Sequence, residues 1–155
     1  MLEKDFNNIV TKSLNANTYG YKIPDTFVSN SFTRAIAPCD VIGLYKYANI
    51  GYPVYIESKS LNKPQAFNFN RLENHQIDFL LKVYNTLGDK GLSLFLICVD
   101  FGRNDKRVFY WKNEDLIKIN ERKINGDNIL KKEFESLTNY ITIKKGLIDF
   151  SKLFE

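Results

Sequence analysis

The spacing of apolar residues along the chain predicts three helices. In three stretches, apolar side chains recur every three or four positions, which gives a helix one apolar face. These stretches are residues 3–14, 70–87 and 113–121. The second opens with Asn70 and Glu73, which have the spacing of a capping box. It is followed by Gly88, a residue type that often ends a helix.

Five further stretches have the apolar and aromatic composition of β-strands. They are residues 39–44, 53–58, 66–69, 92–101 and 107–111. The fourth is apolar nearly throughout, which is typical of a strand buried on both faces. Residues 15–33 are polar and are expected to form a loop with at most a short strand, whereas residues 127–145 fit both a helix and a strand. The order of the elements predicts an α/β fold, with a mixed α+β sheet flanked by helices.

The composition is that of one globular domain spanning residues 1–155. Hydrophobic residues make up 44% of the chain, and no apolar run approaches the roughly 18 residues that a membrane helix needs. The first residues lack the basic flank and apolar centre of a secretory signal. Cys39 and Cys98 lie in strand-like stretches, so we expect buried free thiols, a cytoplasmic location and no membrane partner.

Positive charge is concentrated in the C-terminal third of the chain. The net charge is +4, and residues 103–145 contain eleven Lys and Arg against seven Asp and Glu. A basic surface suits a protein that binds a polyanion such as DNA. A solvated surface of mixed sign explains the same counts, and charge alone favours that simpler interpretation.

A small set of charged residues lies in the first two predicted strands. Tyr55, Glu57 and Lys59 share one face of their strand, because side chains alternate along it. An antiparallel hairpin would bring Asp40 of the preceding strand beside Glu57. Two carboxylates at that separation suit Mg²⁺, which would activate a water and neutralise a phosphate. With Lys59 stabilising the transition state, the set predicts a metal-dependent nuclease.

The same residues have a simpler explanation. An Asp followed by Glu-x-Lys occurs by chance in many proteins, and charges on an edge strand are usually solvated. Judged on these residues alone, the simpler interpretation is favoured over the nuclease.

The wider sequence resembles a known family, and this resemblance favours the nuclease over the solvated surface charges. Pro38-x-Asp40 with Glu57-x-Lys59 matches the PD-(D/E)xK nuclease motif, and the surrounding segments resemble the RecU-type Holliday junction resolvases and their phage relatives. The segments are Phe67–Phe69, His75–Ile77, Leu92–Ile97, Val108–Tyr110 and Ile148–Phe150 with Leu153. The resemblance is closest over residues 36–111 and implies a restriction-endonuclease-like core.

The resemblance also implies roles for individual residues. Asp40 and Glu57 would be metal ligands for Mg²⁺, for which Mn²⁺ can substitute, and Lys59 would be the catalytic lysine. Gln76 would be a helix residue facing the site. Family members usually place an acid on the first helix, often after a Phe. Here Asn7 follows Phe6, which leaves Glu3 as the candidate for a third metal ligand.

The implied activity is the resolution of four-way junctions by a homodimer, in a bacterial cell or a phage-infected host. The segment from Tyr19 to Thr33 is shorter than the stalk of RecU proteins, which leaves the contact with the junction centre open. Basic residues near the motif are expected to contact backbone phosphates. These residues are Arg34, Lys46, Lys63 and Arg71.

Two alternatives remain open at the level of the sequence. A restriction-type enzyme on the same core would cut duplex DNA at a specific sequence. A non-catalytic accessory protein would bind DNA without cutting it. The intact Asp40, Glu57 and Lys59 speak against the second, whereas the uncertain first-helix acid leaves it open.

Overall fold

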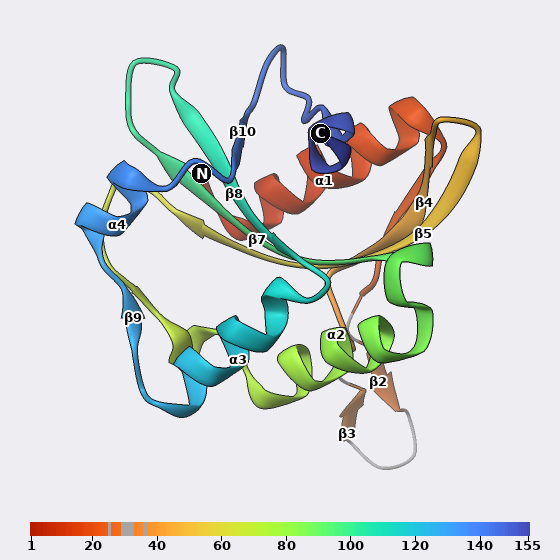
Figure 1. Ribbon diagram of the computed structural model, residues 1–155, viewed down its shortest axis with the longest axis horizontal. Coiled ribbons are helices and arrows are strands. Elements are labelled where there is room, and N and C mark those ends of the chain that lie inside the picture. Colours follow the sequence, from red (N-terminus) through yellow and green to blue (C-terminus); the bar gives the residue numbers. More distant parts are fainter. Residues whose placement is uncertain (25, 29–32, 36) are drawn as a thin grey trace.

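The structure of the protein is a computed structural model (Figure 1). The structure describes residues 1–24, 26–28, 33–35 and 37–155, and for the two short segments 26–28 and 33–35 it describes the backbone alone. Its helices are α1 (Glu3–Asn17), α2 (Asn74–Leu87), α3 (Asp115–Ile124) and α4 (Lys131–Ser136), with 3₁₀ turns η1 (Phe69–Arg71), η2 (Gly88–Lys90) and η3 (Phe150–Phe154).

The main sheet has six strands in the order β1-β4-β5-β7-β8-β10. These strands are β1 (Tyr19–Lys22), β4 (Val41–Tyr47), β5 (Ile50–Leu61), β7 (Leu92–Asp100), β8 (Lys106–Lys112) and β10 (Tyr140–Thr142). Only the central pair β5 and β7 is parallel, and every other neighbouring pair is antiparallel. The predicted mixed sheet flanked by helices is therefore confirmed.

Helices cover the two faces of the sheet unequally. Figure 1 shows α1 and the C-terminal turn η3 on one face, and α2 and α3 on the other. Each face has its own apolar cluster. The first is built around Phe6, Val10 and Leu14 of α1, and the second around Ile77 and Leu80 of α2. Strand β7 contributes to both clusters, because consecutive buried residues point to opposite faces.

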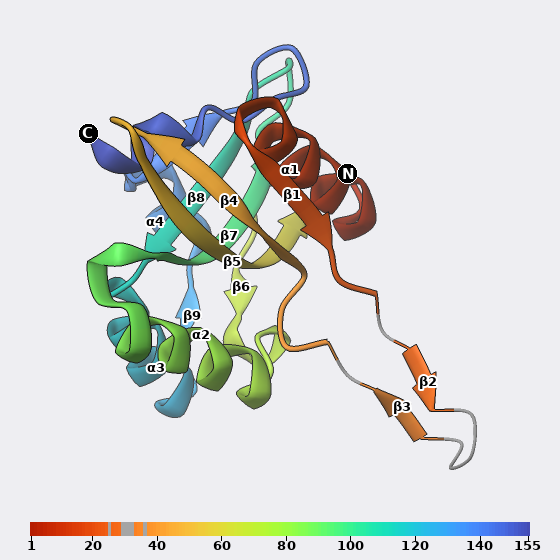
Figure 2. The ribbon, with the colours of Figure 1, turned by 90° about the vertical axis from the view of Figure 1, so that its right-hand side faces the viewer.

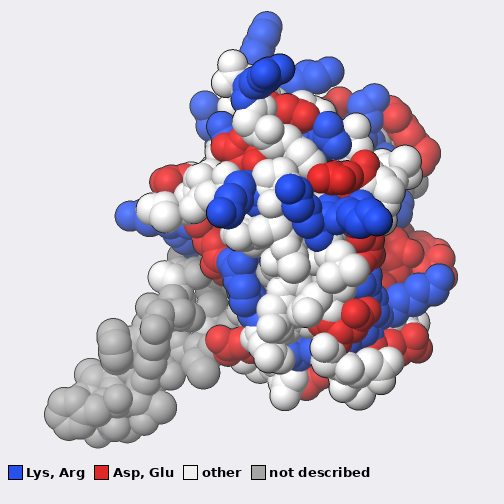
Figure 3. Space-filling view, turned by 90° about the vertical axis from the view of Figure 1, so that its left-hand side faces the viewer, with Lys and Arg blue, Asp and Glu red and all other residues white. Residues whose placement is uncertain are grey.

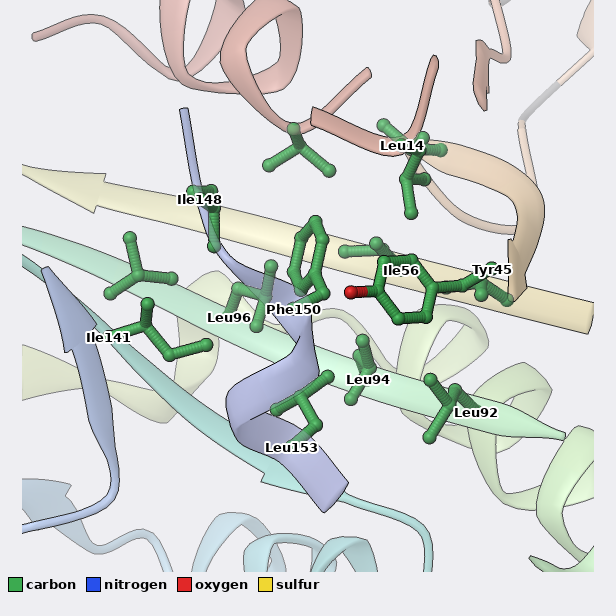
Figure 4. Packing of buried hydrophobic residues seen from close by; sticks show 14 of the residues in the cluster. Leu14, Tyr45, Ile56, Leu92, Leu94, Leu96, Ile141, Ile148, Phe150 and Leu153 are labelled. Atoms are coloured by element: carbon green, nitrogen blue, oxygen red, sulfur yellow. The ribbon is translucent and has the colours of Figure 1, made fainter. Parts of the chain in front are cut away.

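The C-terminal turn is part of the first cluster. Phe150 and Leu153 are almost fully buried, and Figure 4 shows both side chains directed onto the sheet. The ring of Phe150 meets Tyr45 edge-on, with 6.2 Å between ring centroids. This packing ties the last residues of the chain to the central strands.

Two glycines allow α1, β1 and β4 to pack closely together. A Cβ atom at Gly43 would lie 2.3 Å from the carbonyl oxygen of Tyr19, and one at Gly20 would lie 2.7 Å from that of Thr11. Neither gap admits a side chain, because both obstacles are backbone atoms. Gly20 and Gly43 are paired across β1 and β4, so the tight contact runs through two neighbouring strands.

Most predicted elements are present, with shifted ends. Strand β5 begins at Ile50, three residues before the predicted start, and Pro53 is tolerated because β7 pairs with β5 only from Val54 onward. The second helix begins four residues later than predicted. Its capping box is formed by Glu73 and Gln76, so the predicted box of Asn70 and Glu73 was wrong. Asn68 instead caps the short turn η1.

The ambiguous stretch 127–145 contains both kinds of element. Strand β9 (Asn128–Ile129) pairs with β6 (Phe67–Asn68), α4 follows, and β10 then joins the edge of the main sheet.

Cys39 and Cys98 are buried free thiols, as predicted, and burial raises the pKa of each to about 12. Trp111 stacks on Phe95 in the second cluster, with 5.7 Å between ring centroids, so it serves packing.

The segment between β1 and β4 contains a separate ribbon. Strands β2 (Thr26–Val28) and β3 (Thr33–Ala35) pair with each other in an antiparallel register. Figure 2 shows this ribbon extending away from the body of the molecule. Within the described part of the chain, no helix is both long and apolar enough to cross a membrane.

Candidate active site

Asp40 is held at the start of β4 by the hairpin with β5. Its backbone N–H donates to the carbonyl of Ile56, and its carbonyl accepts from Ile23, both at 2.9 Å. The register pairs Val41 with Ile56, so Asp40 lies beside Glu57, as the hairpin argument predicts. The side chain is fixed as well, because Asp40 Oδ2 accepts from the backbone N–H of Ser58 at 2.9 Å.

Glu57 and Lys59 form a buried ion pair. They share one face of β5, and Lys59 Nζ lies 3.0 Å from Glu57 Oε1. Glu57 is 1% exposed and Lys59 is 8% exposed. The interpretation of these residues as solvated surface charges is therefore wrong. A charged pair in the interior carries a large desolvation cost, and such pairs are commonly kept for function.

The pKa of Glu57 is raised from 4.5 to about 8. Burial is the largest cause, because it penalises the charged carboxylate, and the nearby charge of Asp40 raises the pKa further. Lys59 opposes both effects and lowers the pKa. Without a cation, the interior therefore favours the protonated form of Glu57 at neutral pH, and its contact with Lys59 is an ion pair only above that pKa or when a cation offsets the cost of burial.

Helix α1 contributes a polar residue to the site. Asn7 is 6% exposed, and its side chain contacts the hydroxyl of Ser58, which also lies 3.1 Å from Asp40 Oδ2. The Ser58 hydroxyl donates to Asn7 Oδ1, and Asp40 Oδ2 lies within hydrogen-bond distance of the same hydroxyl. Ser58 thus orients the carboxylate of Asp40 through its backbone N–H, and Asn7 holds the side chain of Ser58.

The donor set fits a hard divalent cation. Asp40 and Glu57 supply carboxylate oxygens, and Glu57 Oε1 is buried without a hydrogen-bond donor in satisfactory geometry. Mg²⁺ is commonly bound by one or two carboxylates together with waters and substrate phosphates. A cation here would offset both causes that raise the pKa of Glu57. Two acids are all that the described residues bring together, since no group of three or more potential ligands is found among them.

Glu3 is directed to another partner. Its carboxylate lies 2.5 Å from Arg71 Nη2, and both side chains are about 40% exposed. Arg71 also donates to the carbonyl of Ser60 at 3.3 Å, and its guanidinium lies 5.3 Å from the ring centre of Phe67. Glu3 and Arg71 therefore neutralise each other beside the end of β5. This contact does not test the predicted metal-binding role of Glu3 or the predicted DNA-binding role of Arg71. Both roles stay predictions.

Gln76 has a structural contact at the start of α2. Its Oε1 accepts from the backbone N–H of Glu73 at 2.8 Å, which completes the capping box. Among the described residues, no hydrogen bond joins Gln76 to Asp40, Glu57 or Lys59. Its catalytic role stays a prediction from the resemblance.

Lys46 and Lys63, two of the predicted phosphate contacts, lie apart. Lys63 is exposed in the turn that follows β5, close in sequence to Lys59, whereas Lys46 is exposed near the far end of β4. Six residues of strand separate Lys46 from Asp40, which is about 20 Å. Arg34 falls in segment 25–36, whose side chains lie outside the described part of the structure.

The basic C-terminal third is partly neutralised by its own acids. Arg122 lies 2.7 Å from Asp127 and 2.6 Å from Glu133, and Arg107 lies 2.8 Å from Asp105. Figure 3 shows Lys and Arg interspersed with Asp and Glu over the face that it presents. This distribution agrees with the simpler interpretation of the charge counts on that face.

Asn7 and Ser58 are the site residues that sequence reasoning missed as functional. Ser58 alternates with Glu57 and Lys59 along β5 and is 0% exposed, yet its hydroxyl makes hydrogen bonds at the site. The signal was available in part, because Asn7 occupies the first-helix position after Phe6 where the resembling family usually has an acid. The sequence pattern could not predict the contact between Asn7 of α1 and Ser58 of β5, because these two residues lie 51 positions apart.

Comparisons with known proteins agree with the motif. No curated protein sequence matches the chain. A solved structure with partial similarity is Hjc, a Holliday junction resolvase from Archaeoglobus fulgidus, which is 14% identical. The alignment covers 75% of this chain and 91% of that one, with a TM-score of 0.39. The sequence model of the Recombination protein U family matches residues 2–155, and the protein therefore belongs to that family.

Proposed function

We propose that this protein is a metal-dependent endonuclease that resolves four-way DNA junctions. Its family membership supports a role in recombination. The single observation that carries the proposal is the buried pair of Glu57 and Lys59 beside the half-buried Asp40, because an interior pair of an acid and a lysine is costly to keep without a function.

Each residue has a part in the proposed hydrolysis. Asp40 and Glu57 would hold Mg²⁺, or Mn²⁺ in its place. The metal would neutralise charge on the phosphate and lower the pKa of a bound water. Ser58 keeps the Asp40 carboxylate in one orientation through its backbone N–H, and Asn7 holds the side chain of Ser58. The ammonium group of Lys59 stabilises the charge that develops on the phosphate oxygens. Because Lys59 is largely buried, its charge acts in a medium that screens it less than water does.

The proposed enzyme works as a homodimer in the cytoplasm of a bacterium or a phage-infected host. Resolution of a four-way junction requires two cuts in symmetry-related strands. Each chain contributes one group of Asp40, Glu57 and Lys59, so two chains related by a two-fold axis supply the two cuts.

A non-catalytic DNA-binding protein is the competing function. Asn7 favours it, because an amide stands where related enzymes usually have an acid. The two functions are separated by incubating the protein with a labelled four-way junction, the matching duplex and a single strand, with Mg²⁺ or with EDTA. The nuclease proposal predicts paired cuts in the junction that require Mg²⁺. Binding without any cut would favour the competing function, and sequence-specific cutting of the duplex would favour a restriction-type enzyme.

A further inference from the structure

Two buried side-chain atoms of the described residues have no hydrogen-bond partner. They are Oε1 of Glu57 in the active site and Nε2 of His75 in the first turn of α2. Burying a polar atom without a partner costs free energy, so each such atom in a folded protein calls for an explanation. The two atoms are explained together if they face one space.

The imidazole ring of His75 runs from the surface into the interior. Its Nδ1 lies 3.2 Å from Oε2 of Glu73, whose side chain is 64% exposed. The opposite nitrogen, Nε2, is shielded from solvent. An ionised carboxylate only accepts hydrogen bonds, so Nδ1 carries the proton that faces Glu73, and the neutral ring presents Nε2 as an acceptor. Glu73 thereby fixes both the orientation and the tautomer of His75.

Two contacts fix how α2 lies along β5. Arg71, which precedes the helix, donates to the carbonyl of Ser60 at 3.3 Å. Further along the chain, the ring of Phe79 meets that of Tyr55, with 5.8 Å between the ring centroids. The numbering rises along one element and falls along the other, so α2 runs antiparallel to β5, as Figure 1 shows. The segment between Arg71 and Phe79 therefore lies over the part of β5 between Tyr55 and Ser60.

His75 and Glu57 occupy the same level in this arrangement. His75 lies one helical turn before Phe79, a rise of about 6 Å, and shares its side of the helix. Glu57 lies two residues after Tyr55, about 7 Å along the strand, and shares its face of β5. Because Tyr55 and Phe79 are in contact, His75 and Glu57 are displaced from that contact by similar distances in the same direction. The two unpartnered atoms therefore face the same space between α2 and β5.

The start of α2 does not require the ring of His75. The capping box is complete without it, because the side chains of Glu73 and Gln76 each accept from the other residue's backbone N–H. The inward nitrogen of His75 takes no part in these bonds. A role in helix capping therefore leaves the burial of Nε2 unexplained.

We propose that His75 is a positioning residue of the active site, whose Nε2 accepts a hydrogen bond from a water carried by the cation. The inference rests on the proposed function, because it needs a cation at Asp40 and Glu57. Mg²⁺ retains several waters when one or two carboxylates bind it. A water whose oxygen faces a cation at Glu57 directs its protons away from that cation, and Nε2 is an acceptor in the same space.

Such a hydrogen bond has a defined consequence for hydrolysis. Side chains that accept from or donate to the ligands of a metal hold those ligands in one orientation and tune the affinity for the metal. His75 would hold one water in this way, and Glu73 would hold His75. The pair would reduce the freedom of a water that lies beside the scissile phosphate.

The first measurement is ¹⁵N NMR of protein labelled at histidine, which reports one imidazole because His75 is the only histidine of the chain. At pH 8 in EDTA, the proton should lie on Nδ1, and Nε2 should appear as an unprotonated nitrogen. Mg²⁺ should shift the Nε2 signal of the wild type. The same concentration should leave the signal of Glu57→Gln nearly unchanged, because that variant lacks a ligand for the cation. This readout does not depend on cutting.

Two substitutions separate the role of Nε2 from that of the rest of the ring. Glutamine can place its amide oxygen, an acceptor, close to the position of Nε2, whereas asparagine reaches only as far as Nδ1. At saturating Mg²⁺ and junction, His75→Asn should cut about 10–100-fold more slowly than the wild type, whereas His75→Gln should stay within about threefold of it. Titration calorimetry should show Mg²⁺ binding that is about 10-fold weaker for His75→Asn.

The control is Asp78→Asn, at an exposed position of the same helix, which should match the wild type in cutting and in Mg²⁺ binding. Thermal unfolding of each variant establishes that it is folded. A structural role for the ring would change stability and leave the Mg²⁺ affinity of the folded variants equal.

Three outcomes would overturn the role of His75. They are a neutral ring with its proton on Nε2, an Nε2 signal that Mg²⁺ does not shift, or a His75→Asn variant that binds Mg²⁺ and cuts like the wild type. The nuclease proposal stands in each case if the wild type cuts junctions. A wild type that shows the expected shift of Nε2 but never cuts would support the role of His75 and contradict the nuclease.

Discussion

The burial of Glu57 makes the free energy of unfolding depend on pH, and the substitution Glu57→Gln removes this dependence. In the folded state the pKa of Glu57 is about 8, whereas its ordinary value is 4.5. Between these values the folded protein holds a proton that the unfolded chain releases. The contribution of Glu57 to stability is therefore fully present below pH 4.5 and is lost as the pH rises through about 8.

The size of the effect follows from the interval between the two pKa values. At 1.36 kcal/mol for each pH unit, the loss of stability amounts to at most about 5 kcal/mol without metal. Glu57→Gln removes the titrating group and keeps the shape of the side chain. Both proteins retain Asp40 and Lys59, so the difference between their free energies of unfolding reports mainly on Glu57.

The assay is urea denaturation of both proteins in EDTA between pH 4.5 and 8.5. The wild type should lose several kcal/mol of stability relative to Glu57→Gln over this range. Glu121→Gln, the same substitution at an exposed position, serves as the control for the loss of one surface charge. Adding Mg²⁺ at pH 8 should stabilise the wild type and leave Glu57→Gln nearly unchanged, because a ligand stabilises only the state that binds it.

A difference in free energy of unfolding that does not change with pH would contradict the burial of a titrating Glu57. If the free energies of unfolding of the wild type and Glu57→Gln differ by the same amount, within about 0.5 kcal/mol, at every pH, the Glu57 carboxyl group is not desolvated in the folded protein. A wild type that becomes more stable relative to the variant with rising pH would contradict the sign of the argument.

Three further predictions concern catalysis, the hydrogen bonds of Ser58 and DNA binding. Lys59→Ala should cut a junction about 10²–10³-fold more slowly than the wild type in single-turnover kinetics, whereas Lys90→Ala, at an exposed lysine in η2, should cut at close to the wild-type rate. Ser58→Ala leaves the Asn7 amide buried without its partner, so thermal unfolding should reveal a loss of about 1–3 kcal/mol, and more Mg²⁺ should be needed for half-maximal cutting. Junction affinity measured by fluorescence anisotropy should fall with salt at a log–log slope of about −0.9 for each phosphate neutralised and should vary little with arm sequence.

The sequence predicts the sheet better than the ends of its elements. The apolar runs of β7 and β8 are long and unambiguous, so both strands lie within one or two residues of their predicted bounds. The start of α2 was misplaced because two residues can cap a helix in this region. Asn68 caps the short turn η1, and Glu73 caps α2. Local composition does not distinguish a 3₁₀ turn from the first turn of the helix that follows.

The candidate site was predictable where it depends on one hairpin. Alternation along β5 and an antiparallel partner suffice to bring Asp40 beside Glu57. The burial of Glu57 and Lys59 depends on how α2 and neighbouring segments pack on that face, which periodicity does not specify. The contact of Asn7 with Ser58 requires α1 to cross β5, a tertiary arrangement that no local pattern encodes.

The most direct test of the active site is the comparison of wild type and Asp40→Asn on one labelled four-way junction, with binding and cutting measured at the same Mg²⁺ concentrations. Asp40 serves the chemistry and carries a negative charge that repels phosphate without metal, so the variant should bind the junction at least as well as the wild type in EDTA. We predict that Asp40→Asn loses detectable cutting in Mg²⁺ while it keeps this binding. Cutting by Asp40→Asn at near the wild-type rate would contradict the assignment of the active site.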